Sequence, residues 1–118
     1  ADGKTILDIA KELQELSEKS RERKLDLNDM RGGTFSITNY GSIGGMFATP
    51  IINYPESAIL GVGRIYDKPM AIEGKIEIRK TLPLSLVFDH RIADGAYATR
   101  FLNTIISHLK NPEELMKT

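Results

Sequence analysis

The chain has no cysteine and no tryptophan in its 118 residues, and its 16 Lys and Arg are balanced by 16 Asp and Glu. The lack of cysteine excludes disulfide bonds, thiolate metal sites and a cysteine nucleophile, and it fits a reducing compartment. A net charge of zero gives no electrostatic reason to expect nucleic acid or an anionic membrane as a partner. No apolar run is long enough to cross a bilayer, and no secretory signal begins the chain. We therefore expect a soluble, intracellular protein.

What the chain does contain is ordinary for a globular domain, with 41% hydrophobic and 27% charged residues. Its length suits one domain with a modest core. No cluster of Asp, Glu and His has the spacing of a metal site. Glycine-rich residues 41–45 lack the following Lys-Ser/Thr of a phosphate-binding loop, and residues 61–63 lack the third glycine of a dinucleotide fingerprint.

Two segments have the periodicity of amphipathic helices. One runs from Thr5 to about Glu22, with Thr5 and Asp8 as a loose capping box. The other covers residues 98–109 and is ended by Asn111-Pro112, and His108 lies off its apolar stripe. Residues 25–31 predict a single helical turn.

Three segments predict strands: residues 34–39, residues 57–66, and a long strand over 76–88 whose even positions 76, 78, 82, 84, 86 and 88 are apolar. Pro83 would mark an edge or a bulge in the third strand, and residues 67–69 and 73–74 read as turns. The order of elements favours an α/β sandwich with a mixed or antiparallel sheet. Because the core is small for such a sheet, we expect part of a larger domain or an obligate oligomer.

The segment DHRIADG, residues 89–95, carries the clearest chemical signal. It places His90 between an apolar strand pattern and a helix pattern, in a loop of the kind that presents reactive groups. An imidazole can take and return a proton near neutral pH, so we predict that His90 is a general base. If the even-numbered face points inward, His90 is partly buried and kept neutral, as a base requires.

Structural alternatives stand beside these interpretations. His90 could be a core histidine bonded to a backbone carbonyl, and Asp94 could cap the last helix while Gly95 permits the turn. Capping and orienting the imidazole are compatible roles for Asp94. Thr38 and Asn39 could offer a hydroxyl and an amide to a ligand, but ordinary turn chemistry explains them as well. His108 is expected at the surface.

Three motifs together resemble the dihydrolipoamide acyltransferases, the core subunits of 2-oxoacid dehydrogenase complexes. They are GGTFSITNYGSIGG at residues 32–45, PIINYPESAILGVG at 50–63 and FDHRIADG at 88–95. The resemblance implies that residues 1–118 are the C-terminal part of the catalytic domain. It also implies a fold like chloramphenicol acetyltransferase, an α/β sandwich with a mixed sheet flanked by helices. The N-terminal half of that domain, the lipoyl domain and the peripheral subunit-binding domain are not in this sequence.

The resemblance also implies a reaction, the transfer of an acyl group between dihydrolipoamide and coenzyme A. His90 matches the catalytic base that deprotonates the attacking thiol, and Thr38 stands where many relatives have an oxyanion-stabilising serine. Asp94 matches a position that holds the histidine or its loop, and Asn39 and Gly63 match coenzyme A contacts. The histidine and the hydroxyl are expected to come from different chains of a trimer.

The implied cofactors and partners follow from this family. The resemblance implies that coenzyme A is a substrate and that the lipoyl group is carried on a separate domain. The trimers would build a larger core that binds a 2-oxoacid decarboxylase and dihydrolipoamide dehydrogenase through other parts of the chain, in the cytoplasm or the mitochondrial matrix. Two alternatives stay open. A chloramphenicol acetyltransferase-type enzyme would usually have histidine in place of Asp89, and a non-catalytic scaffold would tend to lack His90.

Overall fold

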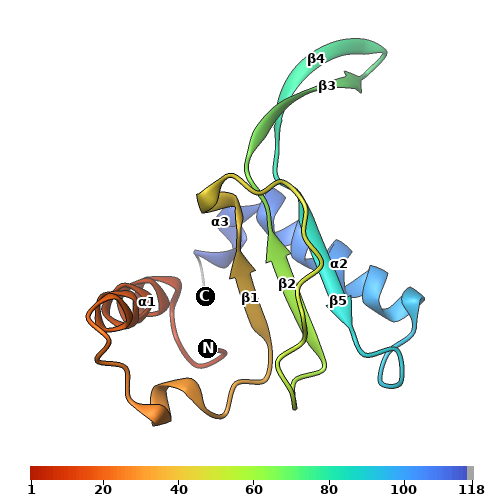
Figure 1. The fold of residues 1–118 in the computed structure, drawn as a ribbon. Helices are drawn as coiled ribbons and strands as arrows, with labels where there is room; N and C mark the ends of the chain where they lie inside the picture. Colours follow the sequence, from red (N-terminus) through yellow and green to blue (C-terminus); the bar gives the residue numbers. More distant parts are fainter. Residues whose placement is uncertain (117–118) are drawn as a thin grey trace. The chain divides into compact units, whose positions relative to one another are not determined.

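Residues 1–116 are described in the computed structural model of the chain (Figure 1). They divide into two units, Ala1–Gly33 with Thr99–Thr118, and Thr34–Ala98. None of the helices within residues 1–116 combines the length and the apolar character needed to span a bilayer.

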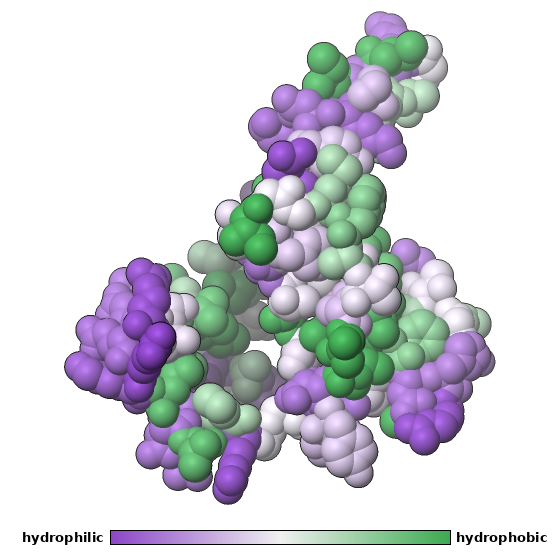
Figure 2. Space-filling model, in the orientation of Figure 1, coloured by the Kyte–Doolittle hydropathy of each residue, from purple (hydrophilic) through white to green (hydrophobic). Residues whose placement is uncertain are grey.

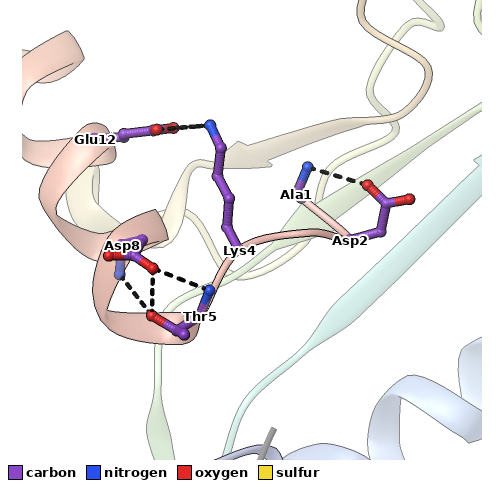
Figure 3. Close-up of polar contacts among 6 residues, drawn as sticks. All are labelled: Ala1, Asp2, Lys4, Thr5, Asp8 and Glu12. Atoms are coloured by element: carbon purple, nitrogen blue, oxygen red, sulfur yellow. Dashed lines mark hydrogen bonds and ion pairs between the residues drawn. The ribbon is translucent and has the colours of Figure 1, made fainter.

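The first unit begins with α1 (Ile6–Arg21), close to the predicted bounds. The capping box is confirmed: the Asp8 amide donates to Thr5 Oγ1 at 3.2 Å, and the Thr5 amide donates to Asp8 Oδ2 at 3.3 Å (Figure 3). The Thr5 hydroxyl, at 2.7 Å, is the main reason that the pKa of Asp8 is lowered. Lys4 pairs with Glu12 at 2.6 Å over the first turns of the helix. The predicted turn in 25–31 is the 3₁₀ helix η1 (Leu27–Met30).

The last helix, α2 (Gly95–Lys110), begins three residues before the predicted start. It starts in the second unit and continues into the first. Asn111-Pro112 ends it as expected and opens a short helix that was not predicted, α3 (Pro112–Leu115), with proline in its first turn.

The second unit contains a mixed sheet, as the sequence predicted, in the order β1-β2-β5 (Figure 1). The strands are β1 (Ser36–Asn39), β2 (Ala58–Val62) and β5 (Leu84–Phe88). β1 runs parallel to β2, with Thr38 opposite Gly61. β5 runs antiparallel to β2, with Phe88 opposite Ala58 and Ser85 opposite Gly61. The register therefore places the end of β5 beside the start of β2.

A separate two-stranded ribbon corrects three predictions. β3 (Tyr66–Ile72) runs through the predicted turn at 67–69, because Pro69 is tolerated in a ribbon whose strands are both edges. The predicted strand over 76–88 is two strands, β4 (Lys75–Thr81) and β5, broken at Leu82-Pro83. The predicted strand over 57–66 is β2, which is shorter and ends at Val62; the Gly63 amide still donates to the Pro83 carbonyl at 2.9 Å, one step further along the same register with β5. The turn at 73–74 is present, with positive φ at Glu73 and Gly74.

The hydrophobic residues of the chain are poorly covered. Within residues 1–116, only Ile59, Leu60 and Ala98 are buried hydrophobic residues. Ile76 and Ile78 of β4 are 83% and 74% exposed, and Figure 2 shows hydrophobic residues spread over the visible surface. A stable domain buries such side chains against something, so this arrangement supports the expected larger domain or oligomer.

Candidate functional site

His90 lies in a tight turn between β5 and α2. The strand register extends one residue past Phe88, because the Asp89 amide donates to the Ser57 carbonyl at 2.8 Å. The chain then turns, and the Asp89 carbonyl accepts from the amides of Ile92 at 2.9 Å and Ala93 at 3.1 Å. His90 is thus presented at the end of a paired strand, as the sequence predicted.

The imidazole itself is exposed, so the expectation of a partly buried His90 is wrong. The two-residue periodicity does hold: the His90 ring stays on the side of Phe88, with the ring centroids 5.5 Å apart and tilted by 37°. The reason for the exposure is that β5 ends two residues earlier and the turn lifts His90 off the sheet. An exposed imidazole also argues against the core-histidine alternative.

Asp94 caps α2. Its carboxylate oxygen Oδ1 accepts from the Tyr97 amide at 2.7 Å, and its carbonyl accepts from the Ala98 amide at 3.0 Å. This confirms the capping alternative. Two ends of the His90 turn are therefore fixed by aspartates, Asp89 at the strand and Asp94 at the helix.

Sequence reasoning missed the interaction between Asp89 and Arg91. The Asp89 carboxylate accepts from the Arg91 amide at 2.9 Å, from Nε at 3.0 and 3.1 Å, and from Nη2 at 2.6 Å. These bonds from Arg91, with its positive charge, lower the pKa of Asp89 to about 2 and raise the pKa of Arg91. The available signal was the Asp-x-Arg spacing directly after a strand, which is typical of a turn closed by a side chain.

Thr38, Asn39 and Gly63 form a second group, at the carboxyl ends of β1 and β2. Thr38 is half-buried, and Asn39 is exposed. The Asn39 side chain accepts from the Ser42 amide at 3.2 Å, and the Asn39 carbonyl accepts from the Ser42 hydroxyl at 3.3 Å. Asn39 thus shapes the entry to the glycine loop, which is the turn chemistry considered as its alternative.

The glycines of this group allow backbone segments to approach closely. A Cβ atom on the buried Gly63 would overlap the carbonyl of Met46, and one on Gly41 would overlap the backbone of Gly63. A Cβ on Gly61 would lie 2.8 Å from the ring of Tyr40. The glycine loop is therefore packed against the end of β2, beside Thr38.

The two groups of candidate residues lie at opposite ends of the sheet. Thr38 is level with Gly61 and Ser85, whereas His90 follows Ser85 by five residues. β5 ends at Phe88, three residues after Ser85, so at about 3.3 Å per strand residue its end is roughly 10 Å from the level of Thr38 along the strand direction, and His90 lies in the turn beyond it. One chain therefore brings His90 together with Asp94, and Thr38 together with Asn39 and Gly63, but it does not bring His90 to Thr38.

No group of three or more His, Asp and Glu side chains in the described part of the chain, residues 1–116, is placed to hold a metal ion. The chemistry that these residues offer is proton transfer at His90 and hydrogen bonding at the Thr38 end.

Comparisons with known proteins connect these motifs to one family. The family model for the 2-oxoacid dehydrogenases acyltransferase catalytic domain matches residues 1–117. The acetyltransferase component of the pyruvate dehydrogenase complex of Acholeplasma laidlawii is 47% identical over 98% of this chain. The mitochondrial succinyltransferase component of the human 2-oxoglutarate dehydrogenase complex is 47% identical over 92% of it.

Solved structures agree in fold. The Azotobacter vinelandii dihydrolipoamide acetyltransferase, studied for the role of a serine, a histidine and an asparagine in its catalytic mechanism, superposes with a TM-score of 0.89 at 43% identity. The cubic core of a pyruvate dehydrogenase multienzyme complex superposes with a TM-score of 0.90 at 42% identity. Each comparison covers 98% of this chain.

The chain is shorter than all of these proteins. It spans 47% of both solved chains, and 21% and 24% of the bacterial and human relatives. Over residues 1–117, nevertheless, the match is continuous and includes all three motifs. The chain belongs to the 2-oxoacid dehydrogenase acyltransferase family and is part of its catalytic domain.

Proposed function

We propose that the protein containing this chain transfers an acyl group between dihydrolipoamide and coenzyme A, and that residues 1–118 are the C-terminal part of its catalytic domain. One observation carries the residue assignment. The serine, histidine and asparagine studied in the A. vinelandii enzyme are spaced along that chain as Thr38, His90 and Asp94 are spaced here. Each replacement keeps a hydrogen-bonding group, a hydroxyl in Thr38 and a side-chain oxygen in Asp94.

His90 is the proposed general base. Its exposure leaves the imidazole accessible to a thiol, which is mostly protonated at neutral pH and must lose its proton to attack. The imidazole takes the proton from the attacking thiol, and the thiolate adds to the thioester carbonyl. When the tetrahedral intermediate collapses, the carbon–sulfur bond of the original thioester breaks, and the leaving thiolate receives the proton from His90.

Thr38 is the proposed donor to the oxyanion of that intermediate. Because Thr38 and His90 lie at opposite ends of the sheet, we infer that each site combines His90 of one chain with Thr38 of a neighbouring copy. Asn39 and Gly63, which lie at the Thr38 end, are the proposed coenzyme A contacts. Asn39 would contact coenzyme A through its exposed side-chain amide. Gly63 would act indirectly, because its lack of a side chain lets the loop that contains Met46 (the Met46 loop) pack closely against it.

Asp94 is proposed to hold the His90 turn through the helix that it caps. In this role asparagine, the residue studied in the A. vinelandii enzyme, is a suitable equivalent, because Asn and Asp are both good capping residues.

Assembly and partners are proposed from the solved and curated relatives. One solved relative is a cubic core, so we infer trimers that build a larger core. The relatives include both an acetyltransferase and a succinyltransferase, so both acyl groups are candidates. The 2-oxoacid decarboxylase and dihydrolipoamide dehydrogenase would bind through segments beyond residues 1–118, in the bacterial cytoplasm or the mitochondrial matrix.

The test is acyl transfer to dihydrolipoamide from acetyl-coenzyme A and from succinyl-coenzyme A, measured on a full-length protein carrying this chain and on its His90→Ala variant. We expect transfer by the parent with one of these donors and its loss in His90→Ala, with the assembled size unchanged. Full activity of His90→Ala would remove His90 as the base. An assembled parent that transfers neither group would favour the scaffold alternative.

A further inference from the structure

We propose that Asp89 is a positioning residue for His90, and that it acts by closing the turn on which the imidazole stands. The inference rests on the proposed function, in which His90 is the general base. It concerns a residue on the strand side of His90, separate from the helix cap provided by Asp94.

The hydrogen bonds of Asp89 converge on the His90 turn from both sides. Its amide is tied to Ser57 on β2 at 2.8 Å, which fixes where the turn leaves the sheet. Its carbonyl accepts from the amides of Ile92 and Ala93, and its carboxylate accepts from the amide of Arg91. Asp89 thus satisfies the three backbone N–H groups that directly follow His90.

The imidazole has little other support. His90 is exposed, and the contact described for its ring is the tilted one with Phe88. A base must meet its thiol at close range and in a defined direction, and small misplacements of a catalytic group are costly in rate. The turn backbone is therefore what holds the imidazole in place, and Asp89 closes that turn.

The side chain of Arg91 helps to hold the Asp89 carboxylate, but it is not the main determinant of the turn conformation. Its guanidinium makes a bidentate interaction with the carboxylate: Nε donates to both oxygens, and Nη2 donates to Oδ2 at 2.6 Å. The Asp89 side chain is only 21% exposed, whereas that of Arg91 is 89% exposed. Exposed ion pairs contribute little, so we assign the larger effect to the bond between the carboxylate and the Arg91 amide.

The experiment compares variants of the full-length protein by kcat, KM for coenzyme A, thermal midpoint and amide exchange of residues 91–93. Asp89→Ala removes the acceptor, whereas Asp89→Asn keeps an oxygen that can accept from the Arg91 amide. Arg91→Met removes only the bidentate interaction. Asp67→Ala, which breaks the Asp67–Lys80 ion pair of the ribbon at 3.2 Å, is the matched control.

We expect Asp89→Ala to lower kcat about ten- to a hundredfold, the cost of misplacing a catalytic group. The KM for coenzyme A should stay close to the parent value, and exchange of the 91–93 amides should accelerate. The thermal midpoint should fall slightly at neutral pH, because the bonds between Asp89 and Arg91 are lost, but the variant should stay fully folded at the assay temperature. Asp89→Asn should restore kcat to within about threefold of the parent, because it keeps the side-chain acceptor. Arg91→Met should cost only a few-fold, and Asp67→Ala should match the parent.

Three results would overturn the inference: parent-like kcat in Asp89→Ala, failure of Asp89→Asn to restore it, or a loss of kcat that disappears when the variant is assayed well below its thermal midpoint. An active parent whose activity needs His90 but not Asp89 would overturn this inference alone. An inactive parent would overturn the proposed function and this inference with it.

Discussion

At the scale of the residue, the proposed chemistry depends on side chains that are exposed or half-buried. His90 is exposed, and Thr38 is half-buried on a four-residue strand. What distinguishes them is the backbone beneath them: a turn closed by Asp89 for His90, and a strand paired with a glycine for Thr38. At this scale, removal of a single functional group is therefore expected to change the activity or the stability.

Thr38 is expected to act through its hydroxyl. Replacing it by valine, which has nearly the same shape, should lower kcat by roughly two to three orders of magnitude, as loss of one oxyanion donor does. Thr38→Ser should stay within about tenfold of the parent, because it keeps the donor. Steady-state acyl transfer with matched protein concentrations checks both variants. Parent-like turnover by Thr38→Val would show that the hydroxyl is not the donor.

The Asp89–Arg91 pair predicts a dependence of stability on pH. Arg91 lowers the pKa of Asp89 from the usual 3.8 to about 2, so the folded state favours the ionised carboxylate. Stability from this pair is fully present above pH 3.8 and is lost as the pH falls toward 2. The thermal midpoint of the parent should exceed that of Asp89→Asn at neutral pH, and the difference should shrink across this window. A difference that stays constant down to pH 2 would contradict the assignment.

At the scale of the element, the site is positioned by helix caps and close-packed glycines. Asp94 starts α2, and Gly63 lets the Met46 loop lie against the end of β2. Both are local features of the backbone. Substitutions that remove them should therefore lower the stability of the protein more than its catalytic rate.

Asp94→Ala removes the cap of α2 and should destabilise the protein by about 1 kcal/mol. Asp94→Asn should differ from the parent by only a few tenths of a kcal/mol, because asparagine caps equally well. Chemical denaturation with a helix-sensitive signal measures both. Equal losses in the two variants would indicate that the charge of Asp94, and not its capping bond, is what matters.

Gly63→Ala should destabilise the protein by about 1–3 kcal/mol, because its Cβ would overlap the backbone carbonyl of Met46 and the backbone there would have to shift. Gly3→Ala is the matched control, since a Cβ there meets nothing within 4 Å. Thermal unfolding of both variants provides the comparison. A parent-like midpoint for Gly63→Ala would show that the Met46 loop moves readily.

The elements were largely predictable from sequence, and the exceptions have physical causes. The capping pair Thr5 and Asp8 identified α1, because capping depends on neighbours in sequence. The break between β4 and β5 was missed because apolar residues resume at even positions from Leu82 onward, although Lys80 interrupts the pattern just before the chain changes sheets. The predicted turn at residues 67–69 was wrong because proline can occur in a strand that has only one partner strand, and the sequence does not show how many partners a strand has.

The candidate site was predictable in its residues but not in its arrangement. The apolar strand pattern and following helix pattern indicated where His90 would stand, yet its exposure depends on β5 ending at Phe88. The hydrogen bonds between the Asp89 carboxylate and the Arg91 guanidinium form only because the backbone turns at these residues, and the sequence pattern does not specify that turn. The opposite placement of Thr38 and His90 follows from strand direction and register, which periodicity does not contain.

At the scale of the whole molecule, the chain leaves most of its hydrophobic residues in the described range, residues 1–116, uncovered. Only Ile59, Leu60 and Ala98 are buried hydrophobic residues in the described range, residues 1–116. The relatives of known structure are about twice as long, and one is a cubic core. Stability and activity are therefore expected to depend on the rest of the domain and on neighbouring copies.

Mixed assemblies should show that sites are shared between copies. Full-length chains carrying Thr38→Val and chains carrying His90→Ala are each expected to be nearly inactive. After dissociation and random reassembly at equal amounts, roughly a quarter of the sites in a symmetric oligomer should pair an intact His90 with an intact Thr38. Acyl transfer should recover to about that fraction of the parent rate. No recovery in verified mixed assemblies would place both residues in the same chain's site.

The separation of Thr38 from His90 along the sheet also matters for newly made chains. With the proposed roles, a chain just released from the ribosome has a base but no oxyanion donor beside it. In that case a single chain would hold only half of the proposed site. Assembly of copies would then be the step that completes the site and starts the proposed chemistry.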